Sequence, residues 1–207
     1  LRKNRILQEL YRGLCKIRFT ASETELEDQV LAAHEIIAPL LTEKNSGTSP
    51  EIFLVGHAHI DHAWLWPIWE TERKAARTFA NMARYSEEFD EFVFIQSQPA
   101  QLEIVKREYP DIFASVKAAY DRGQWEPNGG MWVEADCNLS GGESLIRQFL
   151  VGKQITRDLL GYESDTLWLP DVFGYAAALP QILEGCEIRY FITSKINWND
   201  TTRFPYD

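Results

Sequence analysis

The chain has 207 residues, of which 31 are acidic and 21 are basic, so its formal net charge is −10. This balance argues against binding to nucleic acid or to an anionic membrane surface, because both require clustered lysine and arginine. Hydrophobic residues make up 45% of the chain and charged residues 25%, as in globular proteins, and no apolar run approaches the roughly 20 residues that cross a bilayer.

The first 44 residues are expected to form a helical segment of their own. Residues 6–17 carry aliphatic side chains at helical spacing. Ser22, with Glu25 three residues later, predicts the start of a second helix that continues to Leu40. Residues 45–50 then combine Asn, Ser, Gly, Thr and Pro, which predicts a linker before a second domain at 51–207.

The sequence after this linker alternates between strand-like and helix-like segments. The expected strands are 52–55, 92–95, 124–127, 166–169 and 190–193, and the expected helices are 66–84, 100–109, 112–122, 142–160 and 177–184. This alternation predicts an α/β fold with a parallel sheet flanked by helices. In such folds the functional groups collect in the loops that follow the strands.

The first expected strand runs directly into three of the four histidines of the chain. His57, His59 and Asp61 point to the same side of an extended segment, because side chains alternate with period two. Imidazole nitrogen and carboxylate oxygen together suit zinc, manganese or cobalt. The segment therefore predicts a metal site, in which some of the histidines orient the ligands instead of binding the metal.

Further polar and aromatic residues follow the other strands. Asp171 comes after the strand at 166–169 and can reach the same metal if the two strands are neighbours; turn formation is the alternative reading. Trp64 lies close enough to Asp61 to offer a sugar ring its flat face. Lys195 brings a positive charge after the last strand, unless it is simply a solvated lysine.

A glycine-containing loop carries two more acidic residues. Gly129 and Gly130 permit backbone angles that let the main chain approach a ligand closely. Glu134 and Asp136 lie on one side of the loop if it is extended. Helix capping is an alternative explanation for this acidity, so the sequence leaves the roles of both residues open.

Four phrases, in this order, resemble glycoside hydrolase family 38, the α-mannosidases, and most closely its cytosolic and bacterial branch. They are GHAHIDHAWLWP at 56–67, GGMWVEAD at 129–136, WLPDVFGY at 168–175 and TSKINWN at 193–199. The resemblance implies a parallel β/α barrel-like catalytic domain of about seven strands, of which the five expected here are a part. It also implies that residues 1–44 are the helical segment that precedes this domain.

The resemblance assigns roles to individual residues. It implies one divalent metal ion, usually zinc, with cobalt or manganese as alternatives, held by His59, Asp61 and Asp171. Asp171 is then also the nucleophile. Trp64 stacks beneath the bound mannose, and Phe173 forms a neighbouring aromatic wall.

Four further residues are expected around these groups. Lys195 stands where several family members carry arginine beside the nucleophile, and we expect it to contribute to substrate binding. His57, Glu134 and Asp136 are expected to surround the ligands and orient them without binding the metal themselves.

The implied reaction is retaining hydrolysis of terminal α-mannosides in mannose-containing oligosaccharides or glycosides. A carboxylate attacks the anomeric carbon, and a second carboxyl group about 5 Å away acts first as acid and then as base. The family takes that second group, and another metal-binding histidine, from sequence beyond residue 207. We therefore expect the isolated chain to be inactive, and the sequence leaves homo-oligomerisation of the full-length protein open.

Two other functions fit parts of the sequence. His57 and His59 after a first strand also suit an amidohydrolase-type metal hydrolase, but those enzymes need later histidines and none follows His62. A non-catalytic carbohydrate-binding module would explain the seven tryptophans, but not His59, Asp61 and Asp171. The three scattered cysteines favour a reducing compartment, so we expect a cytoplasmic protein.

Overall fold

The computed structural model describes residues 2–19, 22–42, 50–201 and 204, and the chain separates into two units, Leu1–Phe53 and Leu54–Asp207. The predicted linker at 45–50 lies outside the described residues, except for Pro50. Among the described helices, none has the length and apolar character that a membrane span requires.

The first unit contains a pair of helices, α1 (Arg2–Leu14) and α2 (Glu23–Leu41). The predicted start of the second helix is confirmed, because the backbone N–H and the hydroxyl of Ser22 both donate to Glu25 Oε2, at 2.9 and 2.7 Å. Gly13 is buried against α2, where an added Cβ would come within 2.7 Å of Ile37 Cδ1. The missing side chain therefore allows the two helices to approach each other.

The second unit is built on parallel strands, as predicted. The described strands are β1 (Gly56–His57), β2 (Phe94–Ile95), β3 (Trp125–Glu126), β4 (Thr166–Leu169) and β5 (Tyr190–Thr193). Strands β1, β2 and β3 form one sheet in that order, and β4 pairs with β5 in another. All pairings are parallel; for example, Gly56 lies opposite Phe94, and Thr166 lies opposite Tyr190.

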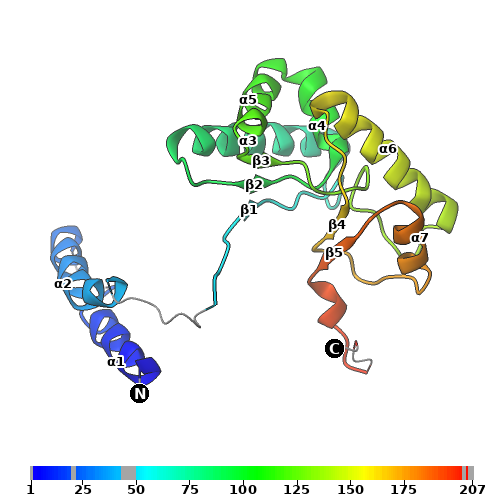
Figure 1. The fold of residues 1–207 in the computed structure, drawn as a ribbon. Coiled ribbons are helices and arrows are strands. Elements are labelled where there is room, and N and C mark those ends of the chain that lie inside the picture. The colour runs from blue at the N-terminus through cyan, green and yellow to red at the C-terminus, as the bar shows by residue number, and fades with distance from the viewer. Residues whose placement is uncertain (1, 20–21, 43–49, 202–203, 205–207) are drawn as a thin grey trace. The chain divides into compact units, whose positions relative to one another are not determined.

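Helices cover these sheets. They are α3 (Ile68–Glu88), α4 (Pro99–Glu108), α5 (Pro110–Asp121), α6 (Gly142–Leu160) and α7 (Leu179–Gly185), with a 3-10 turn, η1, at Lys195–Asn197. In Figure 1, α3 and α5 lie over the β1–β3 sheet, while α6 and α7 lie beside β4 and β5. Phe79 of α3, Phe94 of β2 and Trp125 of β3 pack ring against ring in a core where each is at most 1% exposed.

Two features of the sheets differ from what the sequence predicts: the number of sheets and the start of the first strand. The described strands form two separate sheets, so they show parallel α/β architecture without a continuous barrel wall. Residues 52–55 are not a strand, and Leu54 is 87% exposed. Pairing starts only at Gly56, whose N–H donates to Val93 O at 2.7 Å. A segment with the composition of a strand forms one only where a neighbouring strand supplies hydrogen-bond partners.

Candidate active site

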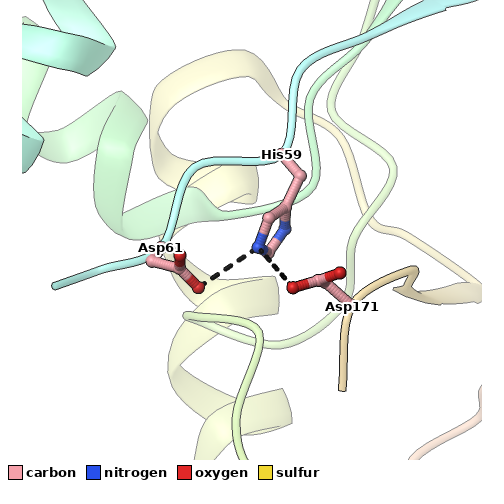
Figure 2. Close-up of side chains that lie close together, drawn as sticks. All are labelled: His59, Asp61 and Asp171. Atoms are coloured by element: carbon pink, nitrogen blue, oxygen red, sulfur yellow. Dashed lines mark hydrogen bonds and ion pairs between the residues drawn. The ribbon is translucent and has the colours of Figure 1, made fainter. Parts of the chain in front are cut away.

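Three of the residues predicted as metal ligands lie together at the ends of β1 and β4. Figure 2 shows the ring of His59 facing the carboxylates of Asp61 and Asp171. His59 Nε2 is 3.2 Å from Asp61 Oδ1 and 3.6 Å from Asp171 Oδ2. One ligand atom from each residue lies within 4.8 Å of the others, and all three residues are partly exposed. The loops after two strands that are distant in the sequence therefore converge on one point.

The loop that carries His59 and Asp61 is fixed by its backbone. Ile60 between them is buried, and its carbonyl oxygen accepts hydrogen bonds from Gln98 Nε2 at 2.7 Å and Gln101 Nε2 at 3.0 Å. The carbonyl oxygen of Asp61 accepts one from the Thr71 hydroxyl at 3.0 Å. The polar start of α4 and the first turns of α3 thus hold the two metal-ligand candidates in place.

The loop that carries Asp171 is fixed from the other side. Lys195 Nζ lies 2.7 Å from Asp171 Oδ1, and the lysine side chain is only 10% exposed. The Tyr175 hydroxyl lies 3.1 Å from the carbonyl oxygens of both Leu169 and Val172, and the Ser194 hydroxyl donates to Pro170 O at 2.6 Å. These contacts close the turn tightly and leave the second Asp171 oxygen facing His59.

A buried carboxylate lies behind His59. Glu134 Oε2 is 2.7 Å from His59 Nδ1, and the Glu134 side chain is 4% exposed. Burial alone lowers the pKa of His59, but the neighbouring carboxylates of Glu134 and Asp61 outweigh burial and raise it to about 9. The carboxylates around His59 therefore attract positive charge strongly.

The residues present fit a divalent cation. His59 Nε2 and the oxygens of Asp61 and Asp171 supply one nitrogen and two carboxylate donors, a set that suits zinc and also manganese or cobalt. Because Glu134 occupies Nδ1, Nε2 is the ring nitrogen that faces the other donors. A cation at this point would take the place of the proton that the same carboxylates attract to His59.

These groups open into a hollow of about 390 Å³, lined by His59, Asp61, Trp64, Glu134, Asp136, Asp171, Val172, Phe173 and Lys195. The predicted aromatic residues stand exposed at its edge, Trp64 at 67% and Phe173 at 77%. Lys195 Nζ lies 3.7 Å from the centre of the Phe173 ring, and so this ring also packs against the cation that pairs with Asp171. The hollow has the size, apolar walls and polar floor of a small-ligand site.

Two histidines of the predicted cluster do not join the metal ligands. His57 Nδ1 lies 2.9 Å from Ile95 O, and its Nε2 lies 3.2 Å from Trp168 Nε1. A carbonyl only accepts and an indole N–H only donates, so His57 donates through Nδ1 and accepts through Nε2, and both nitrogens are engaged. The ring of His62 lies beside Trp132 instead, where burial lowers its pKa.

The glycine loop packs tightly against neighbouring backbone. Gly129 and Gly130 allow a close approach to the protein's own backbone, a reason for these glycines that the sequence did not indicate. A Cβ on Gly129 would lie 1.6 Å from Ser97 O, and one on Gly130, at φ 71°, would lie 2.9 Å from Thr166 O. Asp136 lines the hollow, and its Oδ1 accepts the backbone N–H groups of Asn138 and Leu139, both at 2.8 Å.

The sequence reasoning overlooked the polar segment after β2. Ser97, Gln98 and Gln101 are buried and bond to the site loops, whereas in the sequence analysis residues 96–98 have no role and Gln101 lies only within the helix expected at 100–109. The signal was present, because Gln-Ser-Gln directly follows a strand, where functional groups gather. Trp198, whose ring centre is 4.7 Å from Lys195 Nζ, was also missed, although it lies in a recognised phrase.

Comparison with known proteins identifies the family. A family model described as "Glycosyl hydrolases family 38 N-terminal domain" matches residues 49–207. The chain belongs to glycoside hydrolase family 38. The matched residues include every residue that we assign to the site.

Proteins of this family share substantial identity with the chain. "Alpha-mannosidase 2C1" of Mus musculus is 42% identical over 175 residues, which cover 84% of this chain and 17% of that protein. "Alpha-mannosidase" of Saccharomyces cerevisiae is 37% identical over 156 residues, covering 75% and 14%. The chain therefore spans less than a fifth of the length of these family 38 relatives.

A solved structure of an α-mannosidase from Enterococcus faecalis V583 superposes with a TM-score of 0.61 and 24% identity, over 67% of this chain and 16% of that one. At this identity the superposition supports the fold alone. It agrees with the parallel α/β arrangement of the described family 38 residues.

Proposed function

We propose that this chain carries the nucleophile and part of the metal site of a retaining α-mannosidase that hydrolyses terminal α-mannosides. The observation that carries the proposal is the convergence of His59, Asp61 and Asp171 on one point in a sugar-sized hollow. Membership of family 38 and relatives named α-mannosidase support the substrate class, a mannose-containing oligosaccharide or glycoside.

The proposed chemistry begins at Asp171. Its carboxylate attacks the anomeric carbon while the bond from that carbon to the aglycone oxygen breaks, and a glycosyl-aspartate ester forms. The aglycone oxygen takes a proton from a second carboxyl group, which then removes a proton from the water that cleaves the ester. The ion pair with Lys195 at 2.7 Å fixes the rotamer of the attacking carboxylate.

Neither acidic residue of the glycine loop suits the role of that second group. Glu134 is buried and directs one oxygen at His59 and the other at Ser97. Asp136 has one oxygen engaged by two backbone N–H groups. We therefore place the acid/base residue, and a further histidine ligand, in sequence beyond residue 207, and propose that the isolated chain is inactive.

The proposed cofactor is one divalent metal ion, zinc in preference to cobalt or manganese, held by His59, Asp61 and Asp171. Bound there, it would bind the adjacent 2- and 3-hydroxyls of mannose and orient the ring. Trp64 provides the face on which the sugar stacks, and Phe173 and Lys195 border the same hollow. The exposure of both aromatic rings supports these roles.

In the whole protein, we propose that residues 51–207 are part of a β/α barrel-like catalytic domain and that residues 1–44 precede it as a helical segment. The parallel strands of the second unit and the match of the family from residue 49 support this division. We place the protein in the cytoplasm, which the three free thiols support. Neither alternative function, the amidohydrolase nor the binding module, has support from the family comparison.

The test uses the full-length enzyme and an activated aryl α-mannoside. Proton NMR of the first product should show the α-anomer of mannose, and a chelator should remove activity that added zinc restores. Asp171→Asn should abolish turnover, whereas Asp158→Asn, which changes an exposed carboxylate on α6, should not. A near-normal rate in Asp171→Asn, or a β-anomer as first product, would refute the proposed mechanism.

A further inference from the structure

We propose that Glu134, held by Ser97, is a positioning residue that fixes the ring of His59 so that Nε2 faces the metal. This inference rests on the proposed function, because it assigns a task to a residue behind the proposed ligands. It concerns a carboxylate whose two oxygens are directed at His59 and at Ser97. Glu134 would act only through His59.

Both oxygens of the Glu134 carboxylate have partners. Oε2 lies 2.7 Å from His59 Nδ1, and Oε1 accepts a hydrogen bond from the Ser97 hydroxyl at 2.7 Å. The Ser97 contact fixes the rotation of the carboxylate, and the ion pair between this carboxylate and Nδ1 sets the direction of the imidazole ring. His59 Nε2 is thereby left facing Asp61 at 3.2 Å and Asp171 at 3.6 Å.

The backbone around Glu134 is tied to the same loops. Gln98 accepts the Glu134 backbone N–H through Oε1 at 3.2 Å, while its Nε2 donates to Ile60 O at 2.7 Å. One buried glutamine thus links the residue behind His59 with the residue after it. Gly129 passes so close to Ser97 that an added Cβ would lie 1.6 Å from its carbonyl oxygen, so only glycine fits where the two loops meet.

The burial of Glu134 argues for a functional task. A carboxylate with a 4% exposed side chain loses most of its hydration, a cost that an apolar side chain in the same space would avoid. Nδ1 and Oε2 lie at ion-pair distance, without the alignment of a hydrogen bond. This pairing places the carboxylate beside the distal nitrogen, as in a recurring arrangement in which a carboxylate orients a metal-bound histidine and raises its basicity. Replacing such partners typically weakens metal binding about 10- to 100-fold.

The experiment measures zinc affinity of the full-length enzyme by competition with a chromophoric chelator. It is carried out near pH 9.5, where proton competition at His59, whose pKa is about 9, is small in all variants. Glu134→Gln, which keeps the shape of the side chain, should weaken zinc binding about 10- to 100-fold. Ser97→Ala should weaken it by a smaller factor, and the visible spectrum of the cobalt-substituted enzyme should change in both variants.

The matched control is Glu143→Gln, which removes an equal charge from an exposed residue paired with Arg147 on α6. It should leave both zinc affinity and the cobalt spectrum unchanged. Glu134→Gln with wild-type affinity and spectrum would overturn the inference. If Glu134→Gln does not fold, as judged by circular dichroism, Ser97→Ala decides, and its unchanged affinity and spectrum would overturn the inference equally.

The two proposals fail in different ways. Wild-type enzyme that binds no zinc at all contradicts the proposed function. Wild-type enzyme that binds one zinc, together with a folded Glu134→Gln variant that binds it equally well, contradicts only the role of Glu134.

Discussion

The affinity of the site for its metal should rise steeply between pH 7 and pH 9. Burial alone lowers the pKa of His59, but Glu134 and Asp61 raise it to about 9, so the metal-free site holds a proton at neutral pH. A metal ion binds neutral imidazole, and this proton must therefore leave. Two pH units below a pKa, about one molecule in a hundred carries the neutral ring, so apparent affinity at pH 7 should be about 100-fold below its high-pH limit.

The assay is chelator competition with metal-free, full-length enzyme at intervals from pH 6 to pH 10. Apparent affinity should rise about tenfold per pH unit and level off above pH 9. His34→Gln, which removes the one histidine of residues 1–207 that lies outside the site segment, should leave the profile unchanged. A profile that is flat from pH 7 to pH 9, or that levels off near the ordinary histidine value of 6.5, would refute the reasoning.

The same proton should stabilise the metal-free protein. The pKa of His59 is about 9 in the folded protein and close to 6.5 in the unfolded chain, so this contribution is complete below pH 6.5 and is lost as the pH rises through 9. The difference in unfolding free energy between wild type and His59→Gln, measured in urea without metal, should therefore shrink from pH 6 to pH 9.5. A difference that grows over this range would contradict the assignment.

Four further outcomes are expected. Trp64→Ala removes the exposed stacking face and should lower kcat/KM for an aryl α-mannoside about tenfold. The control Trp69→Ala, which removes another exposed tryptophan, should be near normal, and equal losses would contradict the stacking role. Lys195→Met breaks the 2.7 Å pair with Asp171 and should lower kcat/KM about 100-fold; an unchanged kcat/KM would contradict it. Trp125→Ala opens the aromatic core and should lower the free energy of unfolding in urea by about 3–5 kcal/mol. The exposed control Trp69→Ala should lower it by less than about 0.5 kcal/mol, and similar losses in the two variants would contradict the packing. The isolated chain should be at least about 1000-fold slower than the full-length enzyme, since it lacks the proposed acid, and comparable rates would place that acid within it.

Much of the fold and part of the site could be predicted because the controlling signals are local. Apolar runs of strand length alternating with helical spacing indicate a parallel α/β fold wherever they occur. His59 and Asp61 lie on the same side of one short segment, and Asp171 follows another strand. The rule that functional groups follow strands therefore predicted one metal site containing all three residues. The same rule, applied to Ser97 and Gln98, would have predicted that these residues support the loop that carries His59.

The run at 52–55 shows where local pattern is insufficient. Its composition suits a strand, yet pairing begins at Gly56, because a strand exists only beside a partner and the partner is chosen by tertiary contacts. Gly129 also shows that local sequence is insufficient. The sequence shows that a glycine stands here, but only the tertiary structure shows that the backbone of Ser97 fills the space next to it.

The amino-acid sequence by itself determined which donors this protein offers a metal and a sugar, since ligand chemistry belongs to residue types. Only the tertiary structure decided which of them act together: His57 bonds to Ile95 and Trp168, while His59, two residues later, meets Glu134 on one nitrogen and two aspartates near the other. The physical reason is that hydrogen bonds and ion pairs depend on distances of about 3 Å between segments far apart in the chain, and only folding sets those distances.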